Sequence, residues 1–317
     1  MLRGMSHVTY EGRAAHVLRS PAGDLEATFV PGAGMVGASL RHRGEELLGQ
    51  RRGLAAYAAT GDTMGIPLLH PWANRLSREE YDAAGGHGRL APAAAHVPRD
   101  ELGLPIHGLY GVGPWQVVEA RPVHLSAELH FADDPGVLAA FPFPHRVTVD
   151  VRLDDTTLRV RTTIVPLGDH AVPIAFGFHP YLRLPGVPRA RWVLQLPAMR
   201  RLELDARGIP TGRSDDFGGW RAALGQARFD DCFVDVPHGA ALELEGGGRR
   251  ITLRPGEGYP VAQVYAPGDD DVVALEPMTA PVDALVSGRG LVTIPSHGAF
   301  TAGFAITVED VPPASSG

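Results

Sequence analysis

The strongest constraint on the fold is a strict alternation of apolar and other side chains on both sides of one acidic turn. Residues 147–153 alternate in this way, Asp154 and Asp155 follow, and residues 158–164 resume the pattern. Successive side chains of a β-strand point to opposite faces, so the pattern is typical of half-buried strands. Two such strands joined by a short polar turn predict an antiparallel hairpin.

Other segments agree with a β-rich chain. The leucines at 242–244 and the apolar residues at 251–253 flank three glycines at 246–248, which predicts a second hairpin. Residues 303–308 predict a further strand. Helical signals are short: residues 54–59 and 220–224 could each form about one and a half turns.

Glycine and proline mark many chain reversals. The 317 residues include 39 glycines and 28 prolines, against an average of about 12% for the two together. No repeat or linker divides the chain. We therefore predict an all-β fold, a large antiparallel β-sandwich that forms one domain over residues 1–311, followed by a disordered tail at 312–317.

Charge argues against nucleic acid as a partner. The formal net charge is -7, and the arginines are scattered. Pairs such as Arg51-Arg52 are interpreted as solvated surface, because phosphate binding needs concentrated basic residues.

Cysteine content and hydropathy give an expectation for location. A single cysteine, Cys232, cannot form an intramolecular disulfide. No signal-peptide pattern and no run of about 20 apolar residues is found. We expect a cytoplasmic protein without membrane contact, as a monomer or homodimer.

Two loop-like segments carry hydrogen-bonding side chains beside aromatic residues. GIPLLHPWANRLS at 65–77 contains Asn74 and Arg75, whose donors and acceptors suit hydroxyl recognition. PIHGLYGVGPW at 105–115 places His107 near aromatics, which suit the apolar faces of sugars. Either set could instead satisfy backbone groups within a structural loop.

A second histidine lies between aromatic residues. FGFHPYLRLPG at 176–186 contains His179, which precedes Pro180 and is therefore expected in extended geometry at a strand end. Its imidazole could transfer a proton near neutral pH. The alternative is a hydrogen-bonded core histidine.

Carboxylates and an amide follow in two predicted strands. FDDCF at 229–233 would turn either Asp230 or Asp231 inward, unless both are solvated in a turn. One predicted strand later, Gln263 and Tyr265 alternate so that both side chains point the same way.

Glu276 follows an entirely apolar run at 272–275 and precedes Pro277. A buried carboxylate is costly unless it is paired or used. It could form a structural ion pair, or it could act as a base whose proton affinity is raised by partial desolvation.

Six short motifs in this order resemble the aldose 1-epimerase (galactose mutarotase-like) family. They are PWANRL, IHG, HPYL, FDDCF, QVY and LEPMT, and the resemblance runs from about Gly65 to Glu276. The resemblance implies a β-supersandwich, a free monosaccharide as substrate, and no metal or organic cofactor. Two departures are Leu109 in place of a second glycine after His107, and His70-Pro71-Trp72 in place of a glycine-arginine pair.

The resemblance also implies a role for each matching residue. Glu276 corresponds to the general base and His179 to the general acid, with His107 near the ring oxygen as a third catalytic residue. The implied substrate-binding residues are Asn74, Arg75, Tyr181, Asp230 and Gln263. The expected reaction is interconversion of α and β anomers, which begins with a Glu276 carboxylate and a His179 imidazolium.

Three alternatives remain open. A hexose-6-phosphate 1-epimerase would gather two more basic side chains around Arg75. A non-catalytic sugar-binding protein would place Glu276 and His179 apart, whereas an enzyme is expected to place them across a ring-sized gap in one pocket. A metal site would need His70, His107 and His179 together with an aspartate.

Overall fold

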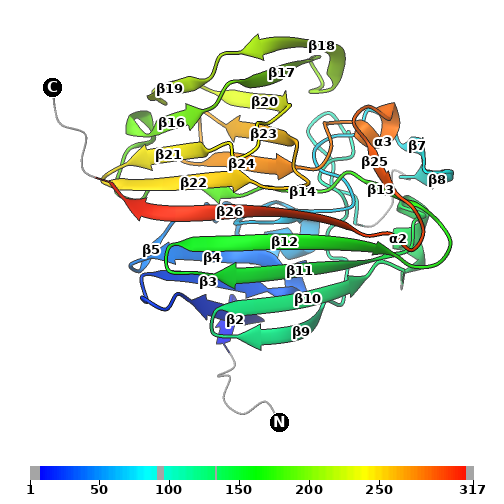
Figure 1. Ribbon diagram of the computed structural model, residues 1–317, viewed down its shortest axis with the longest axis horizontal. Coiled ribbons are helices and arrows are strands. Elements are labelled where there is room, and N and C mark those ends of the chain that lie inside the picture. The colour runs from blue at the N-terminus through cyan, green and yellow to red at the C-terminus, as the bar shows by residue number, and fades with distance from the viewer. Residues whose placement is uncertain (1–7, 91–95, 133, 312–317) are drawn as a thin grey trace.

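Antiparallel strands build most of the chain in the computed structural model, which describes residues 8–90, 96–132 and 134–311. A nine-stranded sheet forms the largest layer, and β26 runs across its middle between β22 and β12 (Figure 1). In spatial order its strands are β19 (Trp220–Ala223), β16 (Val193–Leu196), β21 (Leu242–Gly246), β22 (Arg249–Pro255), β26 (Phe300–Asp310), β12 (Thr157–Pro166), β11 (His145–Leu153), β10 (His124–His130) and β9 (Gln116–Arg121).

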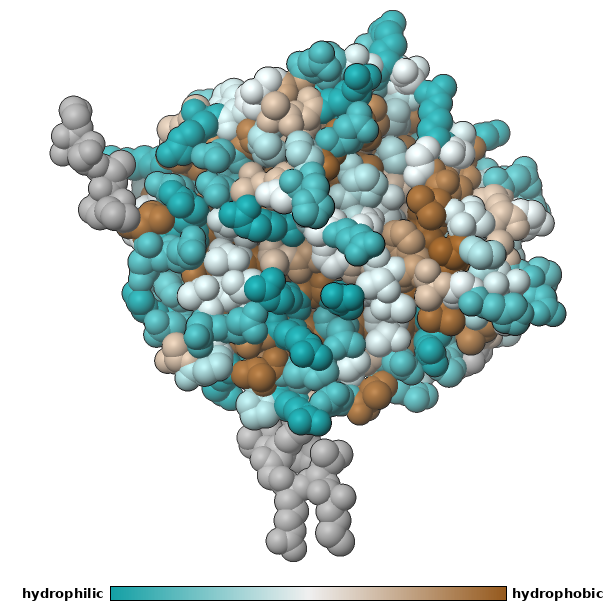
Figure 2. Space-filling view, viewed as in Figure 1, coloured by the Kyte–Doolittle hydropathy of each residue, from teal (hydrophilic) through white to brown (hydrophobic). Residues whose placement is uncertain are grey.

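A five-stranded sheet packs behind one half of this layer, where β2 and β3 contact β11 (Figure 1). Its strands are β1 (Val8–Tyr10), β2 (Arg13–Arg19), β3 (Leu25–Val30), β4 (Val36–His42) and β5 (Glu45–Glu46). The opposite, outward face of β11, β12 and β26 is mostly hydrophilic (Figure 2). The predicted all-β antiparallel sandwich is confirmed.

An eight-stranded sheet lies near β21 and β22 and carries most of the chemistry-bearing residues (Figure 1). Its strands are β18 (Pro210–Phe217), β17 (Met199–Leu204), β20 (Phe229–Val234), β23 (Val261–Ala266), β24 (Val273–Met278), β14 (Gly177–Phe178) and β6 (Leu68–Leu69), with β15 (Tyr181–Leu182) also paired to β24. Cys232, Gln263 and Glu276 are successive cross-strand partners, so their side chains share one face of this sheet.

The remaining elements are short. Two small antiparallel pairs are β13 (Val172–Ile174) with β25 (Val292–Ile294) and β7 (Glu80–Ala83) with β8 (Gly86–Arg89). The helices are α1 (Gly53–Thr60), α2 (Pro135–Ala140) and α3 (Ala284–Ser287), with single 3₁₀ turns at Pro31–Ala33 and Arg189–Arg191. Within the described ranges, no helix has the length and apolarity needed to cross a membrane.

Both predicted hairpins are confirmed, as β11–β12 and β21–β22. Gly247 and Gly248 have φ angles of 60° and 78° and form the two-residue turn of the second hairpin, a geometry that glycine adopts without strain. The strand at 303–308 lies within β26, and the helix at 54–59 lies within α1. The helical prediction for 220–224 is wrong: backbone pairing with β16 makes this segment the edge strand β19.

One hydrophobic core cluster extends along the chain from Leu18 to Val308 and receives side chains from all three large sheets. A single domain therefore remains the simplest interpretation. The predicted tail at 312–317 lies outside the described residues.

Candidate active site

A cavity of about 160 Å³ opens on the face of the eight-stranded sheet that carries Glu276. Seven of the eight predicted site residues line it, and the eighth, Gln263, contacts a lining residue. The lining residues are Arg51, Asn74, Arg75, Ile106, His107, His179, Tyr181, Asp230, Tyr265 and Glu276. A wider groove over β12 and β26 contains none of the predicted residues.

Glu276 and His179 contact each other directly. The Nε2 atom of His179, between β14 and β15, lies 3.1 Å from Oε1 of Glu276 on β24. The two side chains are only 5% and 1% exposed. They share one pocket, but the ring-sized gap expected between them is absent, so that expectation was wrong.

Burial shifts the pKa of both groups of this pair. Burial, together with the negative charge of Asp230, raises the pKa of Glu276 well above its ordinary value. Burial, assisted by His107 and the positive charge of Arg51, lowers the pKa of His179 well below its ordinary value. Both directions favour uncharged groups. These directions are opposite to the expected starting arrangement of a Glu276 carboxylate and a His179 imidazolium.

His107 extends the site beyond the pair. Its ring packs edge-on against His179, with 5.3 Å between ring centroids. Burial and the charge of Arg75 lower the pKa of His107 to about 3, so the imidazole is neutral. The backbone N–H of His107 donates to the carbonyl of Asn74 over 3.0 Å, which joins the two motif-bearing loops.

The backbone of these loops is unusual. Asn74 and His107 have positive φ angles of 59° and 62°, a region that residues other than glycine rarely adopt. Gly108 follows with φ 76°, and a Cβ atom there would lie 2.2 Å from the carbonyl oxygen of His70. This close approach accounts for the one glycine retained in the IHG motif.

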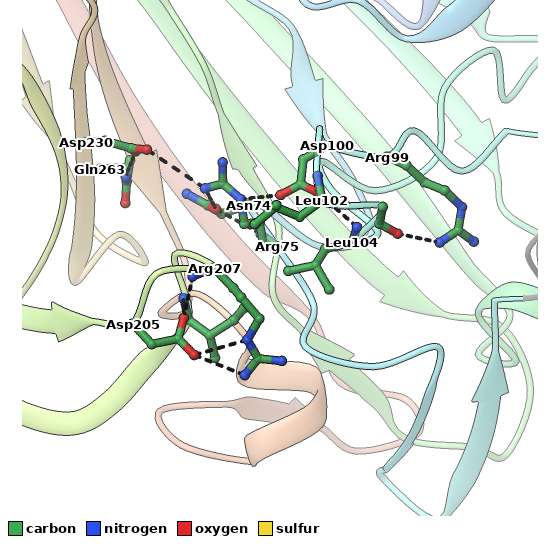
Figure 3. Close-up of polar contacts among 12 residues, drawn as sticks. Asn74, Arg75, Arg99, Asp100, Leu102, Leu104, Asp205, Arg207, Asp230 and Gln263 are labelled. Carbon is green, nitrogen blue, oxygen red and sulfur yellow. Dashed lines mark hydrogen bonds and ion pairs between the residues drawn. The ribbon is translucent and has the colours of Figure 1, made fainter.

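Arg75 is held by a carboxylate as it enters the pocket (Figure 3). Its Nε donates to Oδ2 of Asp100 over 2.7 Å, and Asp100 also accepts the N–H groups of Leu102 and Leu104. Burial alone would raise the pKa of Asp100, but these hydrogen bonds lower it. The Arg75 guanidinium is therefore held by an ionised Asp100 that also accepts two backbone hydrogen bonds.

Asp230 faces the pocket and Asp231 does not, which answers the question left by the FDDCF motif. Gln263 Nε2 donates to Oδ1 of Asp230 over 2.7 Å, and Arg75 Nη1 lies 4.0 Å from Oδ2 (Figure 3). Asp231, one position along β20, points to the opposite side and lies 3.7 Å from Arg201.

Tyr181 lies against His179 at the base of the pocket. The two rings stack with 4.1 Å between centroids, and the phenol oxygen lies 2.6 Å from Oγ1 of Thr63. Only 3% of Tyr181 is exposed. Its contacts with protein groups are therefore more extensive than the surface it offers to a ligand.

Three lining residues were not among the predicted site residues: Arg51, Ile106 and Tyr265. Arg51, interpreted as solvated surface, forms an ion pair of 3.2 Å with Asp270 and places its Cζ 4.9 Å from the Tyr181 ring centroid. Two adjacent arginines in a sequence do not indicate that one of them lines a cavity. Tyr265 could have been included, because its alternation with Gln263 predicts the shared face that is observed.

His70 does not join the other motif histidines. Its Nε2 atom lies 3.0 Å from Nε2 of His145 in a cluster of phenylalanine rings. Among the described residues, no group of three or more His, Cys, Asp or Glu side chains is arranged to hold a metal ion.

The pocket contains buried polar atoms whose hydrogen-bonding capacity is unused within the described structure. They are Oε2 of Glu276, Oε1 of Gln263, Nδ1 of His107 and Nδ1 of His179. Buried polar groups are normally hydrogen-bonded. Several donors and acceptors around one small cavity suit a ligand that carries several hydroxyl groups.

Comparison with known proteins identifies a family. The family model described as aldose 1-epimerase matches residues 28–306. No curated protein matches the chain.

Several solved structures share the fold. The Slr1438 protein from Synechocystis sp. PCC 6803 is 22% identical with a TM-score of 0.76, and the match covers 96% of this chain and 100% of that one. A galactose mutarotase-like protein from Clostridium acetobutylicum is 17% identical with a TM-score of 0.76, covering 91% and 94%. Galactose 1-epimerase from Lactobacillus acidophilus NCFM is 15% identical with a TM-score of 0.75, covering 97% and 98%. The chain therefore has a galactose mutarotase-like fold.

Proposed function

This chain belongs to the aldose 1-epimerase family, and on that premise we propose that it interconverts the α and β anomers of a free aldose. The observation that carries the proposal is the contact of Glu276 with His179 in a small polar cavity. Anomer exchange requires one group to take a proton and another to give one, so a positioned acid and base suffice.

The chemistry is compatible with an acid and a base in contact. The C1 hydroxyl and the ring oxygen of an aldose are bonded to the same carbon, so neighbouring side chains can serve both. Glu276 takes the C1 hydroxyl proton while His179 donates to the ring oxygen, and the ring opens to the aldehyde. After rotation about the C1–C2 bond, reversed transfers close the ring on the other face.

One proton must first cross the pair. The carboxylate and imidazolium needed for ring opening differ from the uncharged pair only by a proton moved between Oε1 and Nε2, which are 3.1 Å apart. Sugar hydroxyls that hydrogen-bond to both groups would stabilise the charged arrangement. His107 is proposed to assist at the ring oxygen.

Asn74, Arg75 and Asp230 are proposed to hold sugar hydroxyls. Arg75 and Asp230 offer a fixed donor and acceptor at the pocket wall, and Gln263 orients Asp230. Asn74 lies beside them. A volume of about 160 Å³ is below the range of about 300–1,000 Å³ typical of larger ligands, which supports a single monosaccharide.

Charge pairing favours a neutral sugar over a hexose 6-phosphate. The phosphate reading required two more basic side chains beside Arg75, but only Arg51 joins it in the lining. Arg51 is paired with Asp270 and Arg75 with Asp100. Each guanidinium is therefore already paired with a carboxylate, and neither is left to pair with a phosphate.

The test is anomer exchange measured by NMR or polarimetry with glucose, galactose, xylose, arabinose and a hexose 6-phosphate. We expect acceleration with at least one free aldose and less with the phosphate. A larger effect on the phosphate would support the 6-phosphate epimerase instead. Sugar binding without acceleration of any substrate would support the non-catalytic binding protein.

A further inference from the structure

A continuous set of contacts links a partly exposed carboxylate to the proposed general acid. Asp270 pairs with Arg51 over 3.2 Å, and the Arg51 guanidinium lies over the Tyr181 ring at 4.9 Å. The Tyr181 ring in turn stacks on His179 at 4.1 Å. Thr63 holds the phenol oxygen at 2.6 Å.

We propose that Arg51 is a positioning residue for His179 that acts through the Tyr181 ring, and not a ligand for sugar hydroxyls. This inference rests on the proposed function. It adds a residue that none of the six sequence motifs contains.

Packing supports the proposal. An imidazole at the end of a two-residue strand has few side chains of its own element to fix its plane, and Tyr181 supplies a flat surface for it. A guanidinium over an aromatic ring is favourable, more so when it is partly desolvated, and the Arg51 side chain is only 31% exposed. Asp270 fixes the guanidinium in place, so the ring beneath it is restrained from tilting.

Charge supports it as well. The positive charge of Arg51 contributes to the lowered pKa of His179, which makes the imidazolium formed during catalysis a stronger acid toward the ring oxygen. Several titratable or charged groups surround His179. They are Glu276 on β24, His107 and Arg75 in the two motif loops, Tyr181 on β15, Tyr265 on β23, Asp230 on β20 and Arg51 before α1.

The experiment compares Arg51→Met, Arg51→Lys and the control Arg52→Met. Arg52 is the adjacent arginine, but it pairs with Asp62 on the surface and is 76% exposed. The kinetics of anomer exchange are measured against pH for each variant with the best aldose substrate.

We expect Arg51→Met to lower kcat by about 10- to 100-fold with little change in KM, because a displaced acid slows the proton transfer. Removal of a positive charge also makes protonation easier, so both limbs of the kcat–pH profile should move to higher pH. Arg51→Lys should restore the position of the limbs but only part of kcat, because an ammonium lacks the planar stacking surface. Arg52→Met should match the wild type.

A double variant tests whether Arg51 acts through the ring. In a Tyr181→Leu background, Arg51→Met should cause little further loss of kcat, because the ring through which it acts is gone. Independent losses that multiply would overturn the proposal. So would an Arg51→Met variant with a raised KM and an unchanged kcat and pH profile, because it would make Arg51 a sugar ligand.

A measurement without substrate separates this proposal from the proposed function. The imidazole proton resonances of His179 are shifted by the ring current of Tyr181, so NMR reports their relative position. Arg51→Met should displace these resonances and Arg52→Met should not. Unchanged resonances would overturn the positioning role, whether or not the wild type accelerates anomer exchange.

Discussion

The Nε2 atom of His179 lies 3.1 Å from Oε1 of Glu276, in surroundings where burial favours the uncharged form of both groups. Both shifts favour a pair that shares one proton over a pair of ions. An added proton would remove the base, and loss of the shared proton would remove the acid. Activity should accordingly fall on both sides of a pH maximum.

Glu276→Gln should abolish most of the anomer exchange. The amide keeps the size of the side chain but cannot accept a proton, so kcat should fall by about 10²- to 10⁴-fold. Glu257→Gln is the matched control, because Glu257 is exposed and lies outside the cavity. Polarimetry of both variants tests this, and a wild-type rate in Glu276→Gln would place the base elsewhere.

The same variant should change how stability depends on pH. The folded pKa of Glu276 is raised above its ordinary value of 4.5, so its contribution to stability is fully present below that pH and is lost as pH rises toward the folded pKa. Glu276→Gln avoids this loss. In urea unfolding, its stability relative to the wild type should increase between pH 4.5 and neutrality; a constant difference would contradict the raised pKa.

Arg75→Lys should weaken productive sugar binding. A lysine cannot both donate to Asp100 and present a planar fork toward the Asp230 side of the pocket. We expect kcat/KM to fall by at least about tenfold, since a hydrogen bond to a charged group contributes about 1.5–3 kcal/mol. Arg207→Lys, in the surface pair with Asp205 (Figure 3), is the control and should leave kcat/KM unchanged.

Gly108→Ala should destabilise the protein. Its φ of 76° disfavours any side chain, and the new Cβ would lie 2.2 Å from the carbonyl oxygen of His70. Gly103 has a similar φ of 79°, but a Cβ there meets nothing within 4 Å. We expect Gly108→Ala to lose at least about 2 kcal/mol more in urea unfolding than Gly103→Ala. Equal losses of unfolding free energy in the two variants would show that the backbone at His70 moves away from the new Cβ at little cost.

The buried pair of His70 and His145 should make the fold sensitive to acid. Burial lowers the pKa of His145 to about 4, and burial with His145 lowers the pKa of His70. Both are lowered from 6.5, so the stability they contribute is present above that pH and is lost as pH falls.

His145→Gln removes one of these proton-binding groups. Below about pH 6 the fall in stability should be less steep than in the wild type by about 1.4 kcal/mol per pH unit, the effect of one proton. Urea unfolding at pH 7.5, 6 and 5 measures this difference. Parallel stability curves for the variant and the wild type would show that His145 already takes up a proton in the folded state.

Strand alternation explains how much of this molecule the sequence could predict. Alternation assigns side chains to faces, so Gln263 and Tyr265 were expected to share one face. It gives no information on which strands become neighbours. The cross-strand partnership of Gln263 with Glu276 therefore came only from the structure.

The residues that sequence reasoning missed depend on contacts between distant segments. Arg51 enters the pocket because Asp270 and Tyr181 meet it there, and no local pattern encodes that meeting. The edge strand β19 shows the same limitation, since residues 220–224 have a weak local preference that backbone pairing with β16 overrides.

Asp283, a buried residue near the start of α3, also escaped prediction. Its carboxylate accepts the N–H and the hydroxyl of Ser77, and its own N–H donates to the carbonyl of Arg75. These three bonds fasten the Arg75 loop to the segment that follows β24, the strand of Glu276. The arginine proposed to bind sugar and the proposed base are thus connected through hydrogen bonds of one short segment. The proposed function therefore implies that a sugar bound by Arg75 has a fixed position relative to Glu276.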